Sequence, residues 1–420
     1  MIPVKTLSHI GFPIKAVLLG ADLNCYSVAR AFYEETGRPS VAFGKYNLGV
    51  TQHTRFVEYN VFDAMEDDEL LVTALRDYAD RVKEEDLTLI LLGCTDEYAA
   101  FLIRNRDRLD DKYIVPYTTP DLLLRLSDKA AFYEVCEKYG ITYPKTVVIS
   151  EPPSADQLEP DALGFDYPII IKPSSSMTYW RYPFEGMEKV YLAKDKSEAA
   201  DIIAKIYGSG YPERVILQDC IPGGDSKMHV LTVYSDKNGK VKAICPGHVL
   251  LEEHTPKGKG NHAAILTETP PEITDRLTSM LEDLGYRGFS NFDIKYDERD
   301  GSFRVFEINL RQGRSNNYIT SSGVNIAALL CADYVCGEEL ELVYLEPGHL
   351  WHSVPYSVVR HYTDDDALVA EAERIRKTKG SASPYFSKAD LSFNPMRMIF
   401  VAETLRRQKT KYKIYCKKMR

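Results

Sequence analysis

The chain lacks both a long apolar run and an excess of basic residues. No stretch of its 420 residues reaches the roughly 18 consecutive apolar residues that a membrane-spanning helix needs. The apolar run nearest the N-terminus, 16–19, is too short for the core of a secretion signal. A formal net charge of −9 leaves no cationic excess to neutralise phosphates, which argues against a general nucleic-acid binder. These absences predict a cytoplasmic protein.

Paired cysteines and nucleotide-binding glycines are also scarce. The eight cysteines form no CxxC motif, and Cys331 with Cys336 is the only close pair, which argues against a zinc site or a disulfide framework. The first strand-to-helix turn, 20–24, lacks the GxGxxG motif, so no NAD or FAD site follows from it. The hydrophobic content of 44% and the chain length predict a soluble protein of two or three domains.

The first 119 residues alternate between strand and helix patterns. Short apolar strands are expected at 14–20, 41–43, 87–93 and 114–115, with helical spacing at 27–35 and 67–83. Such alternation predicts an α/β domain with a parallel, Rossmann-like sheet.

A β-hairpin is expected where strands 289–296 and 303–310 meet at Asp300-Gly301. Alternation along the strands places Glu307, Asn309 and Arg311 on one face, with Asp293 facing outward between two apolar neighbours. Buried carboxylates are costly unless they bind a cation or accept several hydrogen bonds. Asp293, Glu307 and Asn309 are therefore candidate ligands for Mg²⁺, which prefers oxygen donors. A charged strand face that binds nothing is the alternative for any one of them.

Two lysines are placed where a phosphate could bind. Asp128 is a plausible N-cap for a helix that runs to 139, so Lys129 lies in a first turn that disfavours a cation unless an anion is near. Lys172 ends an apolar strand, 167–173, and precedes the small residues Ser174 to Ser176, whose loop could cover a phosphate. A solvated lysine is the alternative reading of Lys129.

Three further segments carry weaker signals. Strand 215–219 breaks at Pro222-Gly-Gly, which frees backbone groups to contact a flat heterocycle, although most such breaks are only turns. The loop 252–262 carries Lys257 and Lys259 and could close on an anionic substrate, or be solvated. The strongly basic segment 406–420 follows Ile399, Phe400, Val401 and Leu405, which suggests an amphipathic helix on the cytoplasmic face of a membrane, with a solvated tail as the alternative.

Lys129, the PIIIKP lysine, the QDCIPGG break, Asp293 and the EINLR strand together resemble the ATP-grasp superfamily over roughly residues 120–340. The resemblance implies an α/β ATP-grasp fold, in which two subdomains grip ATP, preceded by a Rossmann-like domain. It implies a pre-ATP-grasp domain at 1–119, an ATP-grasp domain at 120–344 with a mobile lid at about 145–217, and a C-terminal extension at 345–420.

The same resemblance implies a role for each matching position. Arg311 would stabilise transferring phosphate or acyl-phosphate oxygens, Arg314 would act beside it, and Arg314 with Ser315 would contact an amino-acid substrate. The ATP ligands would be Lys129 and Lys172 at the phosphates, Gln218, Asp219, Cys220 and Ile221 at the adenine, and Asp225 at the ribose; the Mg²⁺ ligands would be Asp293, Glu307 and Asn309.

A narrower likeness points to the D-aspartate ligases of peptidoglycan cross-bridge synthesis and related carboxylate-amine ligases. It is carried by GADLNCYSVARAFYEETG, KAAFYEVCEKYGITYPKT and EINLRQGRSNNYITSSGVN. It implies that ATP activates a carboxylate as an acyl phosphate, which an amine captures as an amide. The substrates implied are D-aspartate and the lysine side chain of a precursor such as muramyl pentapeptide. Dipeptide synthesis from free amino acids and a nucleotide-binding regulator without turnover are the alternatives.

Overall fold

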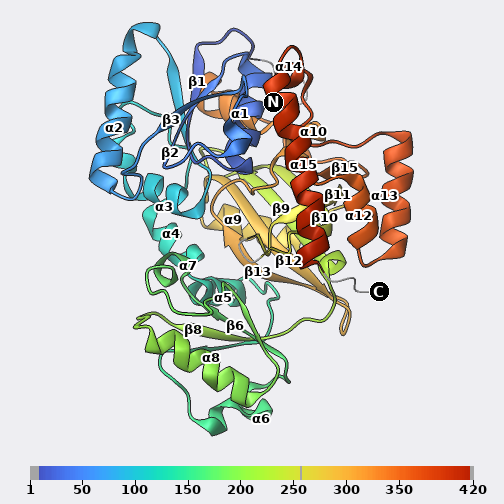
Figure 1. Cartoon of the computed structure of the whole chain (residues 1–420). Coiled ribbons are helices and arrows are strands. Elements are labelled where there is room, and N and C mark those ends of the chain that lie inside the picture. Colours follow the sequence, from blue (N-terminus) through green and yellow to red (C-terminus); the bar gives the residue numbers. More distant parts are fainter. Residues whose placement is uncertain (1–8, 256–257, 417–420) are drawn as a thin grey trace.

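The computed structural model describes residues 9–255 and 258–416. Lys257 of the basic loop and residues 417–420 of the basic tail lie outside the described residues, as do the side chains of Ser176 and Met177. Three β-sheets follow one another along the molecule (Figure 1), from the blue N-terminal sheet at the top, through a central sheet, to the green sheet at the bottom.

The N-terminal sheet is parallel, with strand order β3-β2-β1-β4. Its strands alternate with helices because β1 and β4 are apolar along their length, while α1 starts at the capping carboxylate of Asp22 and ends at the left-handed Gly37. The elements are β1 (Ile14–Leu19), α1 (Leu23–Thr36), β2 (Ser40–Gly44), β3 (Val57–Val61), α2 (Asp68–Arg81), β4 (Thr88–Gly93) and α3 (Asp96–Arg104).

Two segments of this domain differ from the sequence prediction. β3, the sequence VEYNV, is polar and half exposed at the sheet edge, so no apolar pattern marked it. The segment 114–115, expected as a strand, makes a single parallel bridge between Ile114 and Ile90. The parallel Rossmann-like sheet itself is confirmed.

The small sheet is antiparallel, with order β5-β8-β6-β7, and has a hydrophobic core of its own. Helix α8 covers one face of it in Figure 1. The segment after Lys172, predicted as an open loop, instead begins a helical turn that Ser175 caps. The elements from α4 to the end of this sheet are α4 (Pro120–Ser127), α5 (Lys129–Lys138), β5 (Thr146–Ile149), α6 (Pro160–Leu163), β6 (Ile169–Pro173), α7 (Ser176–Tyr179), β7 (Tyr191–Ala193), α8 (Lys196–Gly208) and β8 (Val215–Asp219).

The central sheet contains the predicted hairpin, β12 and β13, at one edge. Its order is β13-β12-β9-β10-β11-β15, and β14 pairs with β10. Gly301 in the turn has a φ of 73°, which glycine adopts without strain. The elements are β9 (Met228–Ser235), β10 (Val241–Glu252), β11 (His262–Thr267), α9 (Thr274–Asp283), β12 (Gly288–Asp297), β13 (Ser302–Asn309), α10 (Asn317–Ser321), α11 (Ile326–Leu330), β14 (Val343–Tyr344) and β15 (Leu350–His352).

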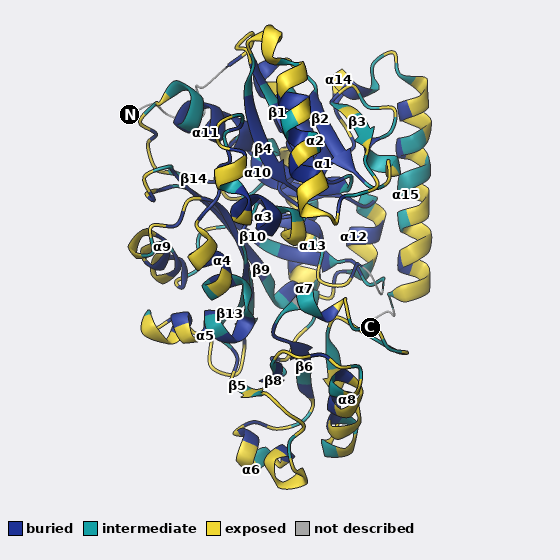
Figure 2. Cartoon of the chain, turned by 90° about the vertical axis from the view of Figure 1, so that its left-hand side faces the viewer, coloured by how far each residue is buried: buried dark blue, intermediate teal, exposed yellow. Residues whose placement is uncertain are grey.

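The C-terminal extension packs along the N-terminal and central sheets, in red in Figure 1. Val401 of the long helix α15 is buried, and Phe400 and Leu405 pack against the main core, so they are not free to form the membrane-facing surface that the sequence suggested. Figure 2 shows the exposed outer side of this helix. The helices are α12 (Tyr356–Tyr362), α13 (Asp366–Thr378), α14 (Lys388–Leu391) and α15 (Pro395–Tyr415).

Across residues 9–255 and 258–416, every helix is too short or too polar to cross a membrane. The eight cysteines are all free thiols.

Candidate active site

The candidate metal ligands lie side by side on one face of the hairpin. Asp293 of β12 pairs directly with Glu307 of β13, and Asn291 pairs with Asn309. Paired residues of antiparallel strands point to the same face, so both carboxylates and the Asn309 amide project together. The Asn309 Nδ2 donates to Asp293 Oδ2 at 3.4 Å, which leaves the amide oxygen as a possible ligand.

The electrostatics of this pair suit a divalent cation. Burial, and then the charge of Glu307, raise the pKa of Asp293 to about 7. The pKa of Glu307 is lowered, because the lysines Lys129, Lys189 and Lys172 outweigh the opposing effect of burial. One carboxylate is thus held charged while its neighbour resists ionising until more positive charge arrives. A bound Mg²⁺ would supply that charge, and the donor set consists of the oxygens that Mg²⁺ prefers.

The two predicted phosphate lysines converge on this same place. Lys129 Nζ lies 2.8 Å from Glu307 Oε2. Lys172 Nζ donates to the Tyr133 hydroxyl at 3.1 Å, and that hydroxyl donates to the carbonyl of Phe306 on β13. Burial, and then the charge of Lys129, lower the pKa of Lys172 to about 7. Two lysine side chains close together in a buried site favour the binding of an anion.

Tyr133 connects the small sheet to the hairpin. Its hydroxyl also accepts a hydrogen bond from Gln218 Nε2 at 2.9 Å, and its ring stacks on Tyr143 with the centroids 4.6 Å apart. Gln218 donates in addition to Thr146 Oγ1 at 2.8 Å. Gln218 therefore faces the same interior as Lys172, one strand away on the small sheet.

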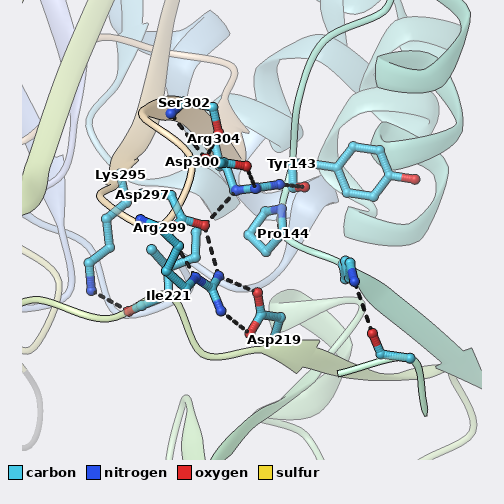
Figure 3. A network of polar contacts seen from close by, with 12 residues as sticks. Tyr143, Pro144, Asp219, Ile221, Lys295, Asp297, Arg299, Asp300, Ser302 and Arg304 are labelled. Carbon is cyan, nitrogen blue, oxygen red and sulfur yellow. Dashed lines mark hydrogen bonds and ion pairs between the residues drawn. The ribbon is translucent and has the colours of Figure 1, made fainter. Parts of the chain in front are cut away.

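Asp219 lies differently from Gln218, because its carboxylate is held by an arginine (Figure 3). Arg299 contacts its two oxygens at 3.1 and 2.5 Å, and the same guanidinium also contacts Asp297. The Asp219 side chain is thus committed to the turn of the hairpin, so contact with adenine would fall to the backbone there. Alternation along β8 accounts for the difference from Gln218.

The break after Asp219 is fixed in place by Lys295. Lys295 Nζ donates to the carbonyl of Ile221 at 2.9 Å (Figure 3). It also donates to the carbonyl of Gly223 at 2.7 Å. Cys220, between Asp219 and Ile221, is partly buried, and burial raises the pKa of its thiol. The hinge predicted to read adenine therefore has a defined backbone conformation, anchored to β12.

Asp225, the candidate ribose ligand, is already tied to the end of β10. Its Oδ2 accepts hydrogen bonds from the Glu252 amide and from His254 Nε2, each at 2.8 Å. Burial, and then the charge of Asp225, raise the pKa of Glu252 to about 8, while burial lowers the pKa of His262 to about 4. His262 Nε2 lies 3.7 Å from Glu252 and 3.8 Å from Asp293. These acidic and imidazole groups connect the candidate ribose and metal positions.

The two arginines after the hairpin reach towards the N-terminal sheet. Arg311 contacts both oxygens of Asp96 at 2.9 and 3.0 Å. Arg314 Nη1 contacts Glu253 at 2.8 Å, and its Nε lies 3.8 Å from Asp22. Asp22 and Asp96 begin the helices that follow β1 and β4, at the carboxyl edge of the parallel sheet, where α/β proteins bind ligands. Ser315 is buried beside Arg314.

The structure brings most predicted residues together, and it adds residues that the sequence reasoning missed. A lone Tyr133 in a helix, or a lone Lys189 in an irregular segment, gives no signal in the sequence. Asp22 and Asp96 could have been found, since each directly follows a strand of the parallel sheet. The missed neighbours are Asp22, Asp96, Tyr133, Lys189, Glu252, Glu253, His262, Lys295 and Arg299.

Comparison with known proteins gives a clear relative. No protein-family model matches the chain. The chain is 35% identical over 382 residues to the D-aspartate ligase of Enterococcus faecium (strain Aus0004), which covers 90% of this chain and 91% of that protein.

Solved structures share the fold at low sequence identity. The L-amino acid ligase from Bacillus licheniformis aligns with a TM-score of 0.55 at 14% identity, over 80% of this chain and 78% of its own. The biotin carboxylase domain of the Hydrogenobacter thermophilus 2-oxoglutarate carboxylase, solved with MgADP, ADP and bicarbonate, gives a TM-score of 0.58 at 16% identity, over 80% and 73%. These likenesses support the ATP-grasp fold that the sequence predicted. With the near full-length match in sequence, they show that the chain belongs to the D-aspartate ligase family of ATP-grasp proteins.

Proposed function

We propose that this protein is an ATP- and Mg²⁺-dependent ligase that joins D-aspartate to an amine of a peptidoglycan precursor. The observation that carries the proposal is the 35% identity to a D-aspartate ligase along almost the whole chain. The cluster of Asp293, Glu307 and Asn309 beside Lys129 and Lys172 supports it, because these residues can hold a metal and a polyphosphate together.

On the nucleotide side, Lys129 and Lys172 neutralise phosphate oxygens while Gln218 and the backbone of 219–221 border the adenine. Asp225 contacts the ribose in this proposal, and the Glu252 amide and His254 hold its carboxylate. When bound, Mg²⁺ neutralises charge on the phosphates. Positioning and charge neutralisation account for most of the catalysis of phosphoryl transfer.

On the amino-acid side, Arg311 and Arg314 lie at the junction with the N-terminal sheet. Arg314 is flanked by Glu253 and Asp22, so cationic and anionic groups alternate there. An amino acid carries both charges: its carboxylates suit Arg311, Arg314 and the neighbouring Ser315, and its ammonium suits Asp22 or Glu253. A carboxylate oxygen held there attacks the γ-phosphorus of ATP and displaces ADP. The amine acceptor then attacks the carbonyl carbon of the acyl phosphate.

Attack by the amine creates negative charge on the former carbonyl oxygen. Arg311 or Arg314 stabilises that oxygen as a fixed, charged donor, because Asp96 and Glu253 restrict the positions of the two guanidinium groups. Expulsion of inorganic phosphate then completes the amide. No serine or cysteine nucleophile takes part.

We further propose that the small sheet acts as a lid. Its core is separate from the main core, and it meets the hairpin through the contacts of Lys172 and Gln218 with Tyr133 and through the ion pair of Asp219 with Arg299. The proposed moving unit spans about 145–217. It is part of an ATP-grasp domain at 120–344, which follows a pre-ATP-grasp domain at 1–119. The extension, 345–420, is proposed to bring the enzyme to the cytoplasmic face of a membrane through its exposed lysines.

The test is a substrate panel with the full-length protein, ATP and Mg²⁺. D- and L-aspartate and other amino acids are each supplied with and without a muramyl pentapeptide, and ADP release and product mass are measured. We expect ADP release with D-aspartate and the pentapeptide, with a product mass that shows one new amide. Glu307→Gln serves as the inactive control.

The alternatives give different outcomes. ADP release with two free amino acids and no pentapeptide would mean a dipeptide ligase. Nucleotide binding with no amino-acid-dependent release of ADP would mean a regulator rather than an enzyme.

A further inference from the structure

A second group of ligand-bearing side chains lies on the opposite face of the central sheet. His229 of β9 and His248 of β10 are directly paired across the two strands. Val230, the residue after His229, pairs with Asp293, so alternation places the histidines on the face away from the proposed Mg²⁺ ligands. Glu268, just after β11, completes the group, and its three candidate ligand atoms lie within 4.8 Å of one another.

Each oxygen of the Glu268 carboxylate faces one imidazole. Glu268 Oε1 lies 2.7 Å from His229 Nδ1, and Glu268 Oε2 lies 3.9 Å from His248 Nδ1. The two rings are nearly parallel, with centroids 4.3 Å apart. Tetrahedral zinc bonds of about 2.1 Å imply ligand atoms roughly 3.4 Å apart, so small side-chain rotations suffice to close the group around an ion.

The hydrogen bond that His248 makes through Nε2 leaves the lone pair on Nδ1 without a hydrogen-bond donor. Its Nε2 lies 2.7 Å from the Ser226 carbonyl, which can only accept, so this nitrogen carries the proton. In the neutral ring, Nδ1 is then the acceptor. That acceptor faces a carboxylate oxygen, with no hydrogen to share between them. A cation bound between them would accept the Nδ1 lone pair and balance the charge of the carboxylate.

The surroundings also match those of known metal sites. Metal-bound histidines usually donate their other N–H to a carbonyl or carboxylate, as His248 does to Ser226. His248 and Glu268 keep about a quarter of their side-chain surface exposed, at 25% and 22%, which gives an ion a route of entry. A zinc site of this kind needs no cysteine, so the lack of a CxxC motif does not exclude it.

We propose that His229, His248 and Glu268 bind a divalent transition metal of the zinc class, with water as the fourth ligand. Imidazole ligands favour Zn²⁺, Ni²⁺ or Co²⁺ and disfavour Mg²⁺, so the two metal sites are chemically distinct. The ion binds Nδ1 of each histidine as a neutral ring with its single proton on Nε2, so in His229 the proton moves from Nδ1 to Nε2. Because Ser226 follows Asp225, the bound ion fixes the segment that carries the candidate ribose ligand.

The test uses the full-length protein, freed of metal and kept in excess Mg²⁺, titrated calorimetrically with Zn²⁺. We expect one tight site, with one Zn²⁺ bound per chain. His248→Gln and Glu268→Gln should each weaken Zn²⁺ binding at least about 100-fold. Co²⁺ should give visible absorption bands that both variants lose.

Two controls separate this site from others. Asp293→Asn removes a proposed Mg²⁺ ligand on the opposite face, and Cys336→Ser removes a thiol from the other cluster of potential ligands, which includes His9 and Glu338. Both should keep wild-type Zn²⁺ affinity. Equal Zn²⁺ affinity in wild type, His248→Gln and Glu268→Gln, with native circular dichroism spectra, would overturn the proposal, as would no Zn²⁺ binding to the wild type. Because the readout is Zn²⁺ binding, the result is independent of the ligase reaction.

Discussion

The ammonium of Lys129 lies 2.8 Å from the carboxylate of Glu307. One residue is proposed to hold phosphate and the other Mg²⁺, so each neutralises the other in the protein alone. Mg²⁺ should pair with Glu307, and the ATP phosphates should pair with Lys129. Binding of both should therefore loosen this ion pair without leaving either charge unpaired. We therefore expect the metal and the nucleotide to bind together.

Glu307→Gln and Asp293→Asn should each lower turnover at least about 100-fold, because each removes a negative metal ligand while keeping size and shape. Steady-state ADP release measures this, and thermal unfolding checks that the fold is intact. Glu69→Gln, at an exposed ion pair with Arg108, is the matched control and should keep full activity. Near wild-type turnover in both site variants would remove the Mg²⁺ assignment.

Mg²⁺ affinity should rise with pH around neutrality. The pKa of Asp293 is raised to about 7, chiefly by burial, and a proton on Asp293 competes with the metal. Between pH 6 and pH 8 the fraction ionised increases roughly tenfold, and the apparent Mg²⁺ affinity should follow. Mg²⁺ titration of turnover measures it. Asp293→Asn, assayed for Mg²⁺ binding to the nucleotide complex, should lose this slope and keep only the contribution of ATP protonation; an unchanged slope would contradict the assignment.

Lys172 should make the free energy of unfolding depend on pH. Its pKa is lowered to about 7 in the folded protein, chiefly by burial, from 10.5. The unfolded state therefore binds more protons between these values, and stability rises with pH across that window. Relative to Lys172→Met, which cannot titrate there, the wild type should gain about 2 kcal/mol between pH 7 and pH 9.

Chemical denaturation of both proteins at each pH measures this gain. If the free energy of unfolding changes with pH alike in the two proteins, the pKa of Lys172 is not lowered by burial, which would contradict the prediction. Lys172→Met should also weaken ATP binding. Lys172→Arg should not restore it, because a planar fork replaces a point charge.

Arg299→Gln should loosen the adenine hinge. The substitution removes two contacts to Asp219 and two to the fully buried Asp297 side chain, although Arg304 still pairs with Asp297 (Figure 3). We expect a loss of about 1–2 kcal/mol in the free energy of unfolding. The KM for ATP should rise several-fold with a smaller change in kcat, because the hinge binds the nucleotide alike before and during reaction. Arg406→Gln, which disrupts an exposed pair with Glu403, should change neither quantity.

Membrane contact should depend on the exposed lysines of α15. Truncation is a poor test, because Tyr412 is buried and its hydroxyl donates to the Glu252 carbonyl at 2.6 Å. The triple substitution of Lys409, Lys411 and Lys413 to Gln leaves that packing intact. The wild type should pellet with anionic vesicles in a salt-sensitive way, and the triple variant should pellet less, by about 1 kcal/mol of binding free energy per charge. Negligible pelleting of both proteins would rule out the membrane proposal.

The sequence by itself determined the hairpin and the parallel sheet. Alternation in β12 and β13 predicted that Asp293 and Glu307 share one face. Their direct pairing also depends on a register shift between Asp293 and Ile294, because the register at the Asp300-Gly301 turn alone would pair Asp293 with Phe306. Such local patterns are readable because the side-chain period of a strand is fixed by its backbone. The edge strand β3 and the helices of the C-terminal extension gave no comparable signal, because their sequences mix polar and apolar residues without a clear period.

Only the tertiary structure decided which distant residues meet. Lys129 and Glu307 are far apart in the chain, and their contact depends on how α5 lies across β13. Asp219 and Gln218 are neighbours in one motif, yet the first binds Arg299 and the second binds Tyr133, because they point to opposite faces of β8. The pairing of His229 with His248 likewise requires two strands to align in one register. Sequence patterns fix the local face of a side chain, whereas packing between elements selects the charge or ligand that it meets.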